Sequence, residues 1–157
     1  APAQVEDAIT KEATSLAGKI AAALNLVGIL AVEMFVTKDN RLLVNELAPR
    51  PHNSGHHTIE ASITSQYEQL LRAILGLPLG NPGLHILSLM MNILENDSLN
   101  SNRQEKLQQL LDMDGVHLHW YGKKGKRLGR KIGHITITDS NMESLVSKAA
   151  AIRKILN

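Results

Sequence analysis

The chain has 157 residues, 43% of them hydrophobic, which is enough for one ordinary domain or two small ones. It contains no cysteine, which excludes disulfides, thiol catalysis and cysteine-based zinc sites and fits a reducing cytoplasm. The net charge of +2 is too small to argue for nucleic-acid binding. No run approaches the roughly 18 apolar residues of a membrane span, and the first residues lack the features of a signal peptide. We therefore expect a cytoplasmic protein with neither a membrane nor a nucleic acid as partner.

The first elements predicted along the chain are a helix and a β-hairpin. Residues 5–24 carry apolar side chains at near-helical spacing, and Gly28 ends the pattern. Two apolar segments, 33–36 and 42–46, then flank the polar turn 38–41. Short apolar runs on either side of a turn predict a β-hairpin.

Each strand of this hairpin carries one carboxylate inside an apolar run. If Asp39 and Asn40 form a two-residue turn, Glu33 lies directly opposite Glu46, with the two Cβ atoms about 5 Å apart on one face. Like charges that close repel unless a cation or a proton lies between them, and carboxylate oxygens are usual ligands of Mg²⁺. Asn45 points to the other face of a regular strand, so it joins this site only through a bulge or a twist. The pair predicts a site for a hard cation, with two solvent-facing glutamates as the alternative.

A rigid loop with cationic and amide side chains follows the second strand. Arg50 lies between two prolines, which exclude helix and hold Arg50 extended. Residues 53–55, Asn-Ser-Gly, are typical of a turn. Because Arg50, His52 and His56 crowd around this turn, we predict that Asn53 and its neighbours contact a ligand.

A second helix is predicted over residues 66–75. Ser65 and Glu68 form a capping box, and Gly76 stops the helix. The residues expected to form its buried stripe are Tyr67, Leu70, Leu71 and Ile74.

The pattern restarts after a linker at residues 80–83. The elements predicted beyond it are a buried strand over 85–94, a helix over 103–113, a strand over 116–121, a basic glycine-rich turn over 122–129, a strand over 131–138 and a helix that Ser140 and Glu143 cap and that ends at 156. We therefore expect an α/β chain in two pieces, residues 1–82 and residues 83–157.

The second piece contains a basic turn and a strand face lined by imidazoles. Six of the nine residues in 123–131 are basic, which is typical of a solvated hairpin tip, a phosphate site or a nucleic-acid patch. Aromatic residues make up only 3% of the chain, which argues against a base-stacking platform. A zinc site that combines His117 and His119 with histidines of the first piece lacks the helical i, i+4 spacing of such sites. We expect these two histidines to be hydrogen-bonded structural residues, and His134 to line a pocket or to pack.

Four parts of the sequence resemble motifs of a known family. The strands around Glu33 and Glu46 resemble the metal-binding strands of the ATP-grasp superfamily. The stretch APRPHNSGH at 48–56, together with VHLHWYGK at 116–123 and GRKIGH at 129–134, is more specific. These motifs resemble the 5-(carboxyamino)imidazole ribonucleotide synthases, and not the carbamoyl-phosphate or biotin-dependent relatives.

This resemblance implies a fold, a reaction and site residues. Residues 1–82 would form the C-terminal lobe of an ATP-grasp domain, and residues 83–157 a small α/β domain. The reaction would join bicarbonate to the exocyclic amine of aminoimidazole ribonucleotide with ATP, through carboxyphosphate, in purine biosynthesis. Mg²⁺, or alternatively Mn²⁺, would neutralise the transferring phosphoryl group. The resemblance assigns the metal to Glu33 and Glu46 with Asn45 beside them, bicarbonate to Arg50, His52 and Asn53, and the ribose phosphate to Lys123 and Arg130.

The resemblance covers nearly the whole chain, but the chain resembles only the C-terminal part of the family's enzyme. We expect the isolated chain to be inactive, because the N-terminal substrate domain and the other nucleotide-binding lobe are not among its residues. That N-terminal part and a second subunit, in a homodimer, are the expected protein partners. His57 stands where the family often has an aromatic residue, which weakens any role for His57 itself. The alternatives are a purine-pathway ligase such as the formate-dependent glycinamide ribonucleotide transformylase, and a non-catalytic module that binds phosphate or nucleic acid.

Overall fold

The computed structural model describes residues 1–157, which divide into two compact units. The amino-terminal unit comprises Pro2–Ile59 and Ile63–Gly83, and the carboxyl-terminal unit comprises Ala1, Glu60–Ser62 and Leu84–Asn157. Both units combine helices with antiparallel strands, so the predicted mixture of helix and strand is confirmed. None of the helices has the length and apolar character required to span a bilayer.

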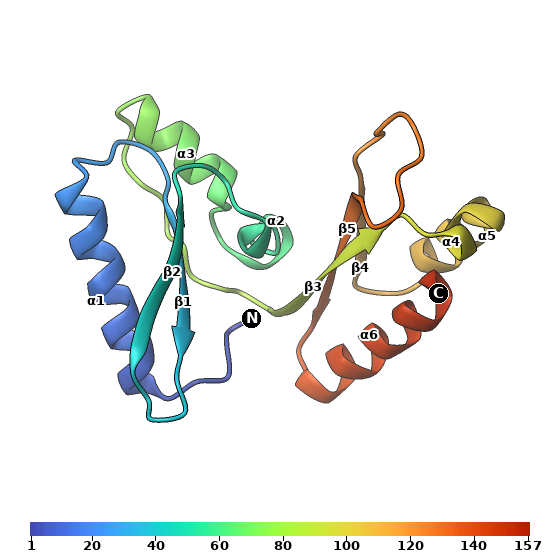
Figure 1. Ribbon diagram of the computed structural model, residues 1–157, viewed down its shortest axis with the longest axis horizontal. Helices are drawn as coiled ribbons and strands as arrows, with labels where there is room; N and C mark the ends of the chain where they lie inside the picture. The colour runs from blue at the N-terminus through green and yellow to red at the C-terminus, as the bar shows by residue number, and fades with distance from the viewer. The chain divides into compact units, whose positions relative to one another are not determined.

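The amino-terminal unit follows the predicted element order. Its elements are α1 (Asp7–Ala23), β1 (Ala31–Val36), β2 (Leu42–Ala48), the 3₁₀ turn η1 (Asn53–Gly55), α2 (Thr58–Ala61) and α3 (Gln66–Ile74) (Figure 1). The short helix α2 lay outside the prediction, and its last residues belong to the other unit. The unit buries few large apolar side chains, with Ile9 and Ala48 as its buried hydrophobic residues.

The hairpin has a different turn from the one predicted. The backbone N–H of Thr37 donates to the carbonyl of Arg41 over 2.9 Å, so the loop has three residues instead of two. Its last residue, Asn40, has a φ of 58°, the left-handed conformation that closes such loops. This turn shifts the pairing to Val36↔Leu42 and Met34↔Val44, and a bulge at Asn45 then restores Glu33↔Glu46. The prediction of the turn was wrong, and the predicted pairing of the two glutamates is confirmed.

Helix α3 starts as predicted but exposes three of the four residues expected to be buried, while Leu70 is half-buried. The Ser65 hydroxyl accepts a hydrogen bond from the backbone N–H of Glu68 over 3.3 Å, which caps the helix. Leu71 and Ile74 are each 55% exposed, and Tyr67 is also exposed. The buried residue of α3 is instead a polar one, Gln66. Apolar periodicity shows which side chains share a face, whereas a second surface is needed to bury them.

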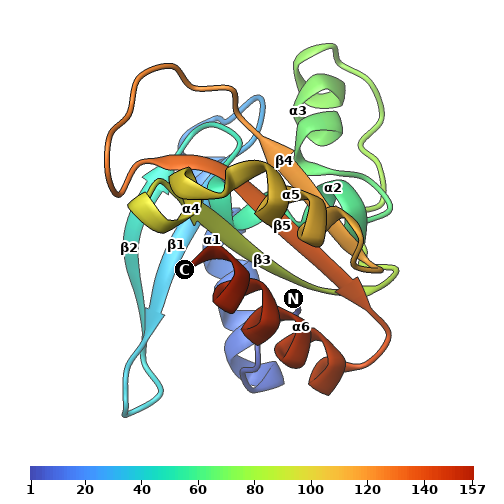
Figure 2. The same cartoon turned by 90° about the vertical axis from the view of Figure 1, so that its right-hand side faces the viewer.

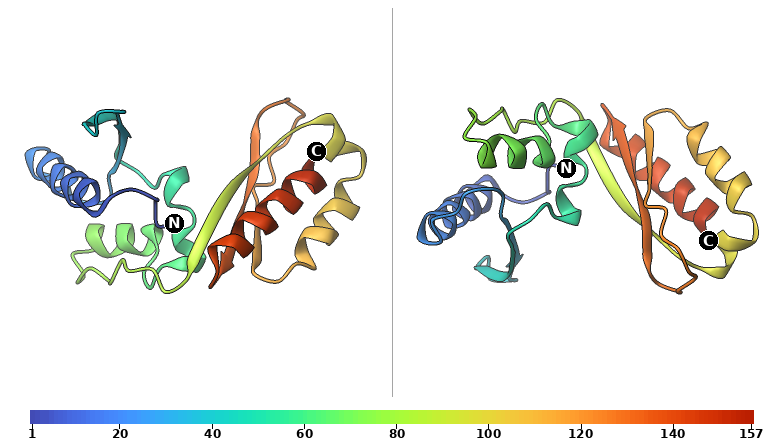
Figure 3. Two further views of the ribbon diagram at one scale, coloured as in Figure 1. Left: turned by 90° about the horizontal axis from the view of Figure 1, so that it is seen from below. Right: turned by 90° about the horizontal axis from the view of Figure 1, so that it is seen from above.

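The carboxyl-terminal unit is a three-stranded sheet with helices on one face. Its elements are β3 (Leu87–Leu94), α4 (Asp97–Ser101), α5 (Arg103–Leu111), β4 (Val116–Trp120), β5 (Lys131–Asp139) and α6 (Met142–Leu156). The strand order is β3-β5-β4, with both pairings antiparallel. Helix α6 packs on β3 and β5, and α5 packs on α6 and β4, so both helices cover the same face (Figures 2 and 3).

The two faces of this sheet differ in polarity because side chains alternate along each strand. The face under the helices is apolar. Its buried side chains, with those of the helices, are Ile93, Leu99, Leu110, Ile132, Ile135, Ile137, Leu145, Ile152 and Leu156. The opposite face carries paired polar residues, among them His117 beside Thr136 and His119 beside His134. The predicted imidazole-lined face is therefore present.

The N-terminus of α6 differs from its prediction by one residue. Asn141, and not Ser140, caps the helix, since its side-chain oxygen accepts from the backbone N–H groups of Glu143 and Ser144 over 2.7 and 3.2 Å. Asp139, the last residue of β5, also stabilises the N-terminal part of α6. Its carboxylate accepts hydrogen bonds from the Ser144 hydroxyl over 2.6 Å and from Lys148 Nζ over 2.8 Å. The hydrogen bonds from Lys148, Ser144 and the backbone of Asn141 keep the pKa of Asp139 well below its usual range.

Candidate functional site

Two glutamates face each other at the end of the β1–β2 hairpin. Glu33 on β1 and Glu46 on β2 are paired directly across the strands, so their side chains leave the same face. The bulge lies one residue away and redirects Asn45, whose Nδ2 lies 3.4 Å from Glu33 Oε2. The sequence analysis required a bulge or a twist for Asn45 to reach the glutamate face, and the structure has that bulge.

His52 completes a cluster with the two glutamates. Its Nε2 lies 3.3 Å from Glu33 Oε1 and 3.9 Å from Glu46 Oε1. Its Nδ1 lies 2.8 Å from the Ser54 hydroxyl and 3.4 Å from the backbone nitrogen of Ser54, so the loop holds this side of the ring while Nε2 faces the carboxylates. The His52 side chain is only 12% exposed, while those of Glu33 and Glu46 are 39% and 58% exposed. The carboxylates are therefore open to solvent and the imidazole is held in place.

The cluster fits the requirements of a hard cation. One ligand atom from each of Glu33, Glu46 and His52 lies within 4.8 Å of the other two. Two oxygens bound to one Mg²⁺ are at most about 4.2 Å apart, because each lies about 2.1 Å from the ion. Small side-chain rotations of the two exposed glutamates would therefore bring their oxygens into range. Carboxylate oxygens with open positions for water or phosphate are a donor set typical of Mg²⁺.

Gln66 fixes the loop that carries His52, and the sequence analysis missed this role. Its Oε1 accepts from the backbone N–H of His52 over 2.9 Å, and its Nε2 donates to the His52 carbonyl over 2.9 Å. A Cβ at Gly55 would lie 2.6 Å from Gln66 Oε1, so the loop needs glycine there for the amide to approach. In the sequence, Gln66 is marked only by its place after the capping residue of α3, and no pattern assigns it to a distant loop.

The other loop residues lie next to the cluster in the chain. Arg50 is exposed, and its Nη1 donates to the carbonyl of Pro51 over 3.1 Å. Asn53 begins the 3₁₀ turn η1 directly after His52. His57 Nδ1 is hydrogen-bonded to the Ser54 carbonyl over 2.9 Å, which is a contact within the loop. His56 lies 2.9 Å from the Tyr67 hydroxyl, and burial raises the pKa of Tyr67.

Lys123 and Arg130 belong to the carboxyl-terminal unit, at the two ends of the loop between β4 and β5. Lys123 Nζ donates to the Lys131 carbonyl over 2.7 Å, and Arg130 Nη1 donates to the Lys124 carbonyl over 3.1 Å. The side chains of Lys123 and Arg130 thus stabilise the loop to which they belong.

The tip of this loop is tied to the chain that follows β3. The carboxylate of Glu95 accepts from the backbone N–H of Arg127 over 2.9 Å, and Lys126 pairs with Asp97 over 2.7 Å. Glu95 is buried, which makes this a firm attachment. The structure therefore holds the basic segment as an ordered loop.

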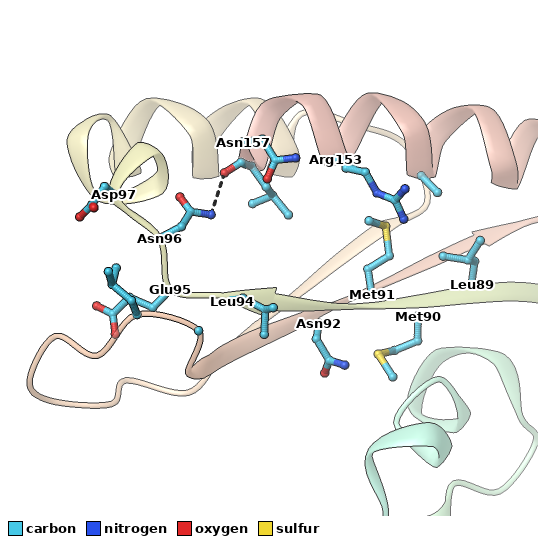
Figure 4. A pocket seen from close by; sticks show the side chains of 14 residues that line it. Leu89, Met90, Met91, Asn92, Leu94, Glu95, Asn96, Asp97, Arg153 and Asn157 are labelled. Atoms are coloured by element: carbon cyan, nitrogen blue, oxygen red, sulfur yellow. Dashed lines mark hydrogen bonds between the residues drawn. The ribbon is translucent and has the colours of Figure 1, made fainter.

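An open groove of about 740 Å³ runs along β3 on the side of α6 (Figure 4). Leu89 and Met91 point towards α6, whereas Met90 and Asn92 point to the other side of the strand. One cationic side chain, that of Arg153, lines the groove. The acidic residues Glu95 and Asp97 also line it, and they already bind the basic loop through Arg127 and Lys126. The groove contains no cluster of ligands comparable to that of Glu33 and Glu46, so we place the candidate site at the hairpin.

Family models match both units of the chain. Residues 1–67 match the model described as ATP-grasp domain, and residues 88–148 match the one described as phosphoribosylaminoimidazole carboxylase C-terminal domain. An N5-carboxyaminoimidazole ribonucleotide synthase of Bacillus subtilis is 51% identical over 136 residues, which are 86% of this chain and 34% of that protein. The chain thus spans about a third of the length of this relative.

Solved structures give the same result. A synthetase of this name from Thermotoga maritima has a TM-score of 0.89 and 44% identity, over 99% of this chain and 43% of that one. A synthase from Aspergillus clavatus, solved with ADP and 5-aminoimidazole ribonucleotide, has a TM-score of 0.88 and 34% identity, over 98% of this chain and 41% of that one. These matches confirm the resemblance drawn from the motifs.

Proposed function

We propose that this chain, which belongs with the carboxyaminoimidazole ribonucleotide synthases of the ATP-grasp superfamily, supplies part of the active site of an ATP-dependent carboxylase. The substrates would be ATP, bicarbonate and aminoimidazole ribonucleotide. The observation that carries the proposal is the Glu33–Glu46 pair with His52 against it, on an ATP-grasp hairpin. Residues 1–82 would be the C-terminal lobe of the nucleotide-binding domain, and residues 83–157 the small domain that follows it.

Glu33 and Glu46 are the residues proposed to hold Mg²⁺ or Mn²⁺, with Asn45 as a neighbouring oxygen donor. When bound, the cation supplies positive charge against the phosphoryl group in transfer. The two exposed carboxylates keep open positions that phosphate oxygens can take. His52 lies 3.3 Å from Glu33 and would hold that carboxylate in position.

Arg50, His52 and Asn53 are proposed to bind bicarbonate. A bicarbonate oxygen would attack the γ-phosphorus of ATP, releasing ADP and forming carboxyphosphate. The exocyclic amine of the ribonucleotide would then attack the carbon, and inorganic phosphate would leave. A guanidinium matches a small planar anion with two parallel donors. The Gln66 side chain is hydrogen-bonded to the backbone N–H and to the carbonyl of His52. These two bonds would hold the neighbouring hydrogen-bond donors in position for the anion.

Lys123 and Arg130 are proposed to bind the ribose phosphate of the substrate. Their loop carries three glycines with positive φ, at 122, 125 and 129, and such backbone conformations let N–H groups approach a phosphate. Lys123 is exposed and Arg130 is half-buried, and both lie at the ends of an anchored loop, so they present charge at little cost in conformational entropy.

The exposed apolar residues of the hairpin suggest a covering partner. Five of them are between 42% and 59% exposed, namely Phe35, Val36, Leu43, Val44 and Leu47. Exposed apolar side chains gathered on one hairpin are typical of an element that another part of a protein covers. We expect the N-terminal part of a synthase to cover it and complete the nucleotide site, and we expect the full-length enzyme to be a homodimer.

The reaction can be tested by joining this chain to the N-terminal part of the Bacillus subtilis relative. We expect the chimera to release phosphate from ATP with bicarbonate, and aminoimidazole ribonucleotide to stimulate release. Glu46→Gln and Arg50→Ala should each lower the rate by about 100-fold or more, whereas Glu68→Gln on α3 should leave it unchanged. ATP turnover without stimulation, or a preference for formate over bicarbonate, would move the assignment to another purine-pathway ligase.

Metal binding can be tested on the chain itself. We expect Mn²⁺ to broaden the NMR signals of residues around Glu33 and Glu46, and Glu33→Gln or Glu46→Gln to weaken this binding at least tenfold. The isolated chain should show no ATP hydrolysis. Hydrolysis by the isolated chain that Glu46→Gln abolishes would contradict the need for a second lobe. Salt-sensitive binding of RNA or DNA through Lys123, Lys126 and Arg127 would instead support the nucleic-acid alternative.

A further inference from the structure

A line of contacting side chains crosses the polar face of the carboxyl-terminal sheet. It begins at Glu60, whose Oε1 accepts from His119 Nε2 over 2.6 Å. The Glu60 side chain is 11% exposed, and its second carboxylate oxygen is buried without a hydrogen-bond partner. A carboxylate so enclosed depends strongly on the one donor that it has. The contact therefore fixes the position of His119.

The line continues from His119 to Tyr121 through a second imidazole. The rings of His119 and His134 are stacked, with centroids 4.3 Å apart and planes 4° from parallel. His134 Nδ1 is hydrogen-bonded to the Tyr121 hydroxyl over 2.9 Å. His134 is only 3% exposed, so it cannot turn without disturbing both neighbours.

The strand pairing explains how the two imidazoles come so close. His119 and His134 are direct partners across β4 and β5. A Cβ at the neighbouring Gly133 would lie 2.5 Å from the His119 carbonyl oxygen. The close approach of the two strands therefore requires glycine at 133, and it brings the ring planes to stacking distance.

The line ends at the ammonium of Lys123. Lys123 Nζ lies 5.3 Å from the centroid of the Tyr121 ring and donates to the Lys131 carbonyl over 2.7 Å. A cation over an aromatic face is attracted by the ring quadrupole. Lysine has a long flexible side chain, so two such contacts restrict where its charge lies.

We infer that Glu60, His119, His134 and Tyr121 are positioning residues that fix the ammonium of Lys123 for a phosphate group. The identity of that group as a ribose phosphate rests on the proposed function. No residue of the line needs to touch the ligand except Lys123. The role of the first four residues is to reduce the number of positions that the ammonium can take before binding, which raises affinity by preorganisation.

The test measures the order of the Lys123 side chain by NMR relaxation of its ammonium group in the 157-residue chain. We expect His119→Ala and Tyr121→Phe each to increase the mobility of the ammonium group. Tyr121→Phe removes a single hydroxyl from a half-exposed residue, so it tests the line without loss of a buried ring. The matched control is His117→Ala, because His117 lies on the same face of β4 but is hydrogen-bonded to Thr138, over 3.2 Å.

A second readout uses ribose 5-phosphate as the probe. We expect His119→Ala and Tyr121→Phe to raise its Kd by about two- to fivefold, and His117→Ala to leave it unchanged. Lys123 order that is the same in His119→Ala, Tyr121→Phe and the control would overturn the inference. Lys123 order that depends on His119, in a chain that binds no ribose 5-phosphate, would uphold the positioning role and reject the phosphate assignment of the proposed function.

Discussion

Replacing Gln66 with methionine should release the loop that carries His52. The substitution keeps the length of the side chain but removes the acceptor of the His52 N–H and the donor to the His52 carbonyl. Each such hydrogen bond contributes about 1 kcal/mol net, and a buried group left without a partner costs more. We therefore expect the loop to lose about 2–3 kcal/mol of local stability.

Amide hydrogen exchange measures this loss directly. A decrease of about 2–3 kcal/mol in the opening free energy corresponds to roughly 30- to 150-fold faster exchange of the His52 amide. Because His52 lies against Glu33, Mn²⁺ binding should weaken in the same variant.

The chain offers a matched control on the same helix. Gln69 makes the same reciprocal pair of bonds with Gly80, over 2.7 and 2.9 Å. Gln69→Met should speed the exchange of the Gly80 amide and leave His52 and Mn²⁺ binding unchanged. Equal His52 exchange in wild type and Gln66→Met would refute the reasoning, because it would show that the loop is held by other contacts.

Three further predictions concern β5 and α1. The pKa of Asp139 is lowered by Lys148, Ser144 and the Asn141 backbone, so its contribution to stability is present above pH 3.8, the usual value, and is lost as the pH falls through the folded value. Asp139→Asn should therefore lower the Tm at pH 7, and the difference from wild type should shrink as acid titrations go below pH 3.8. Gly133→Ala should destabilise the sheet by about 1–3 kcal/mol in urea unfolding, because its Cβ would meet backbone. Gly18→Ala, with open space around it in α1, should instead stabilise by about 0.5–1 kcal/mol, and destabilisation there would contradict the helix-propensity argument.

The sequence alone was sufficient for features that depend on short-range periodicity. The two-residue period of the strands predicted that Glu33 and Glu46 share a face, and the pairing is present. The turn was predicted incorrectly, because a three-residue loop and a two-residue loop both suit Lys-Asp-Asn. The extra residue in the loop shifts the register by one residue, and the bulge at Asn45 shifts it back. Glu33 and Glu46 are therefore paired as predicted, although the predicted turn was wrong.

The tertiary structure decided the contacts between residues far apart in the chain. Gln66 and His119 carry no signal of their own, since a glutamine that starts a helix and a histidine in a strand are compatible with many partners. Their partners, His52 and Glu60, are 14 and 59 residues away. Likewise, the stripe of α3 is apolar by sequence, but its exposure depends on what lies against it. Local patterns fix which side chains share a face, whereas the packing of whole elements determines which of those faces meet.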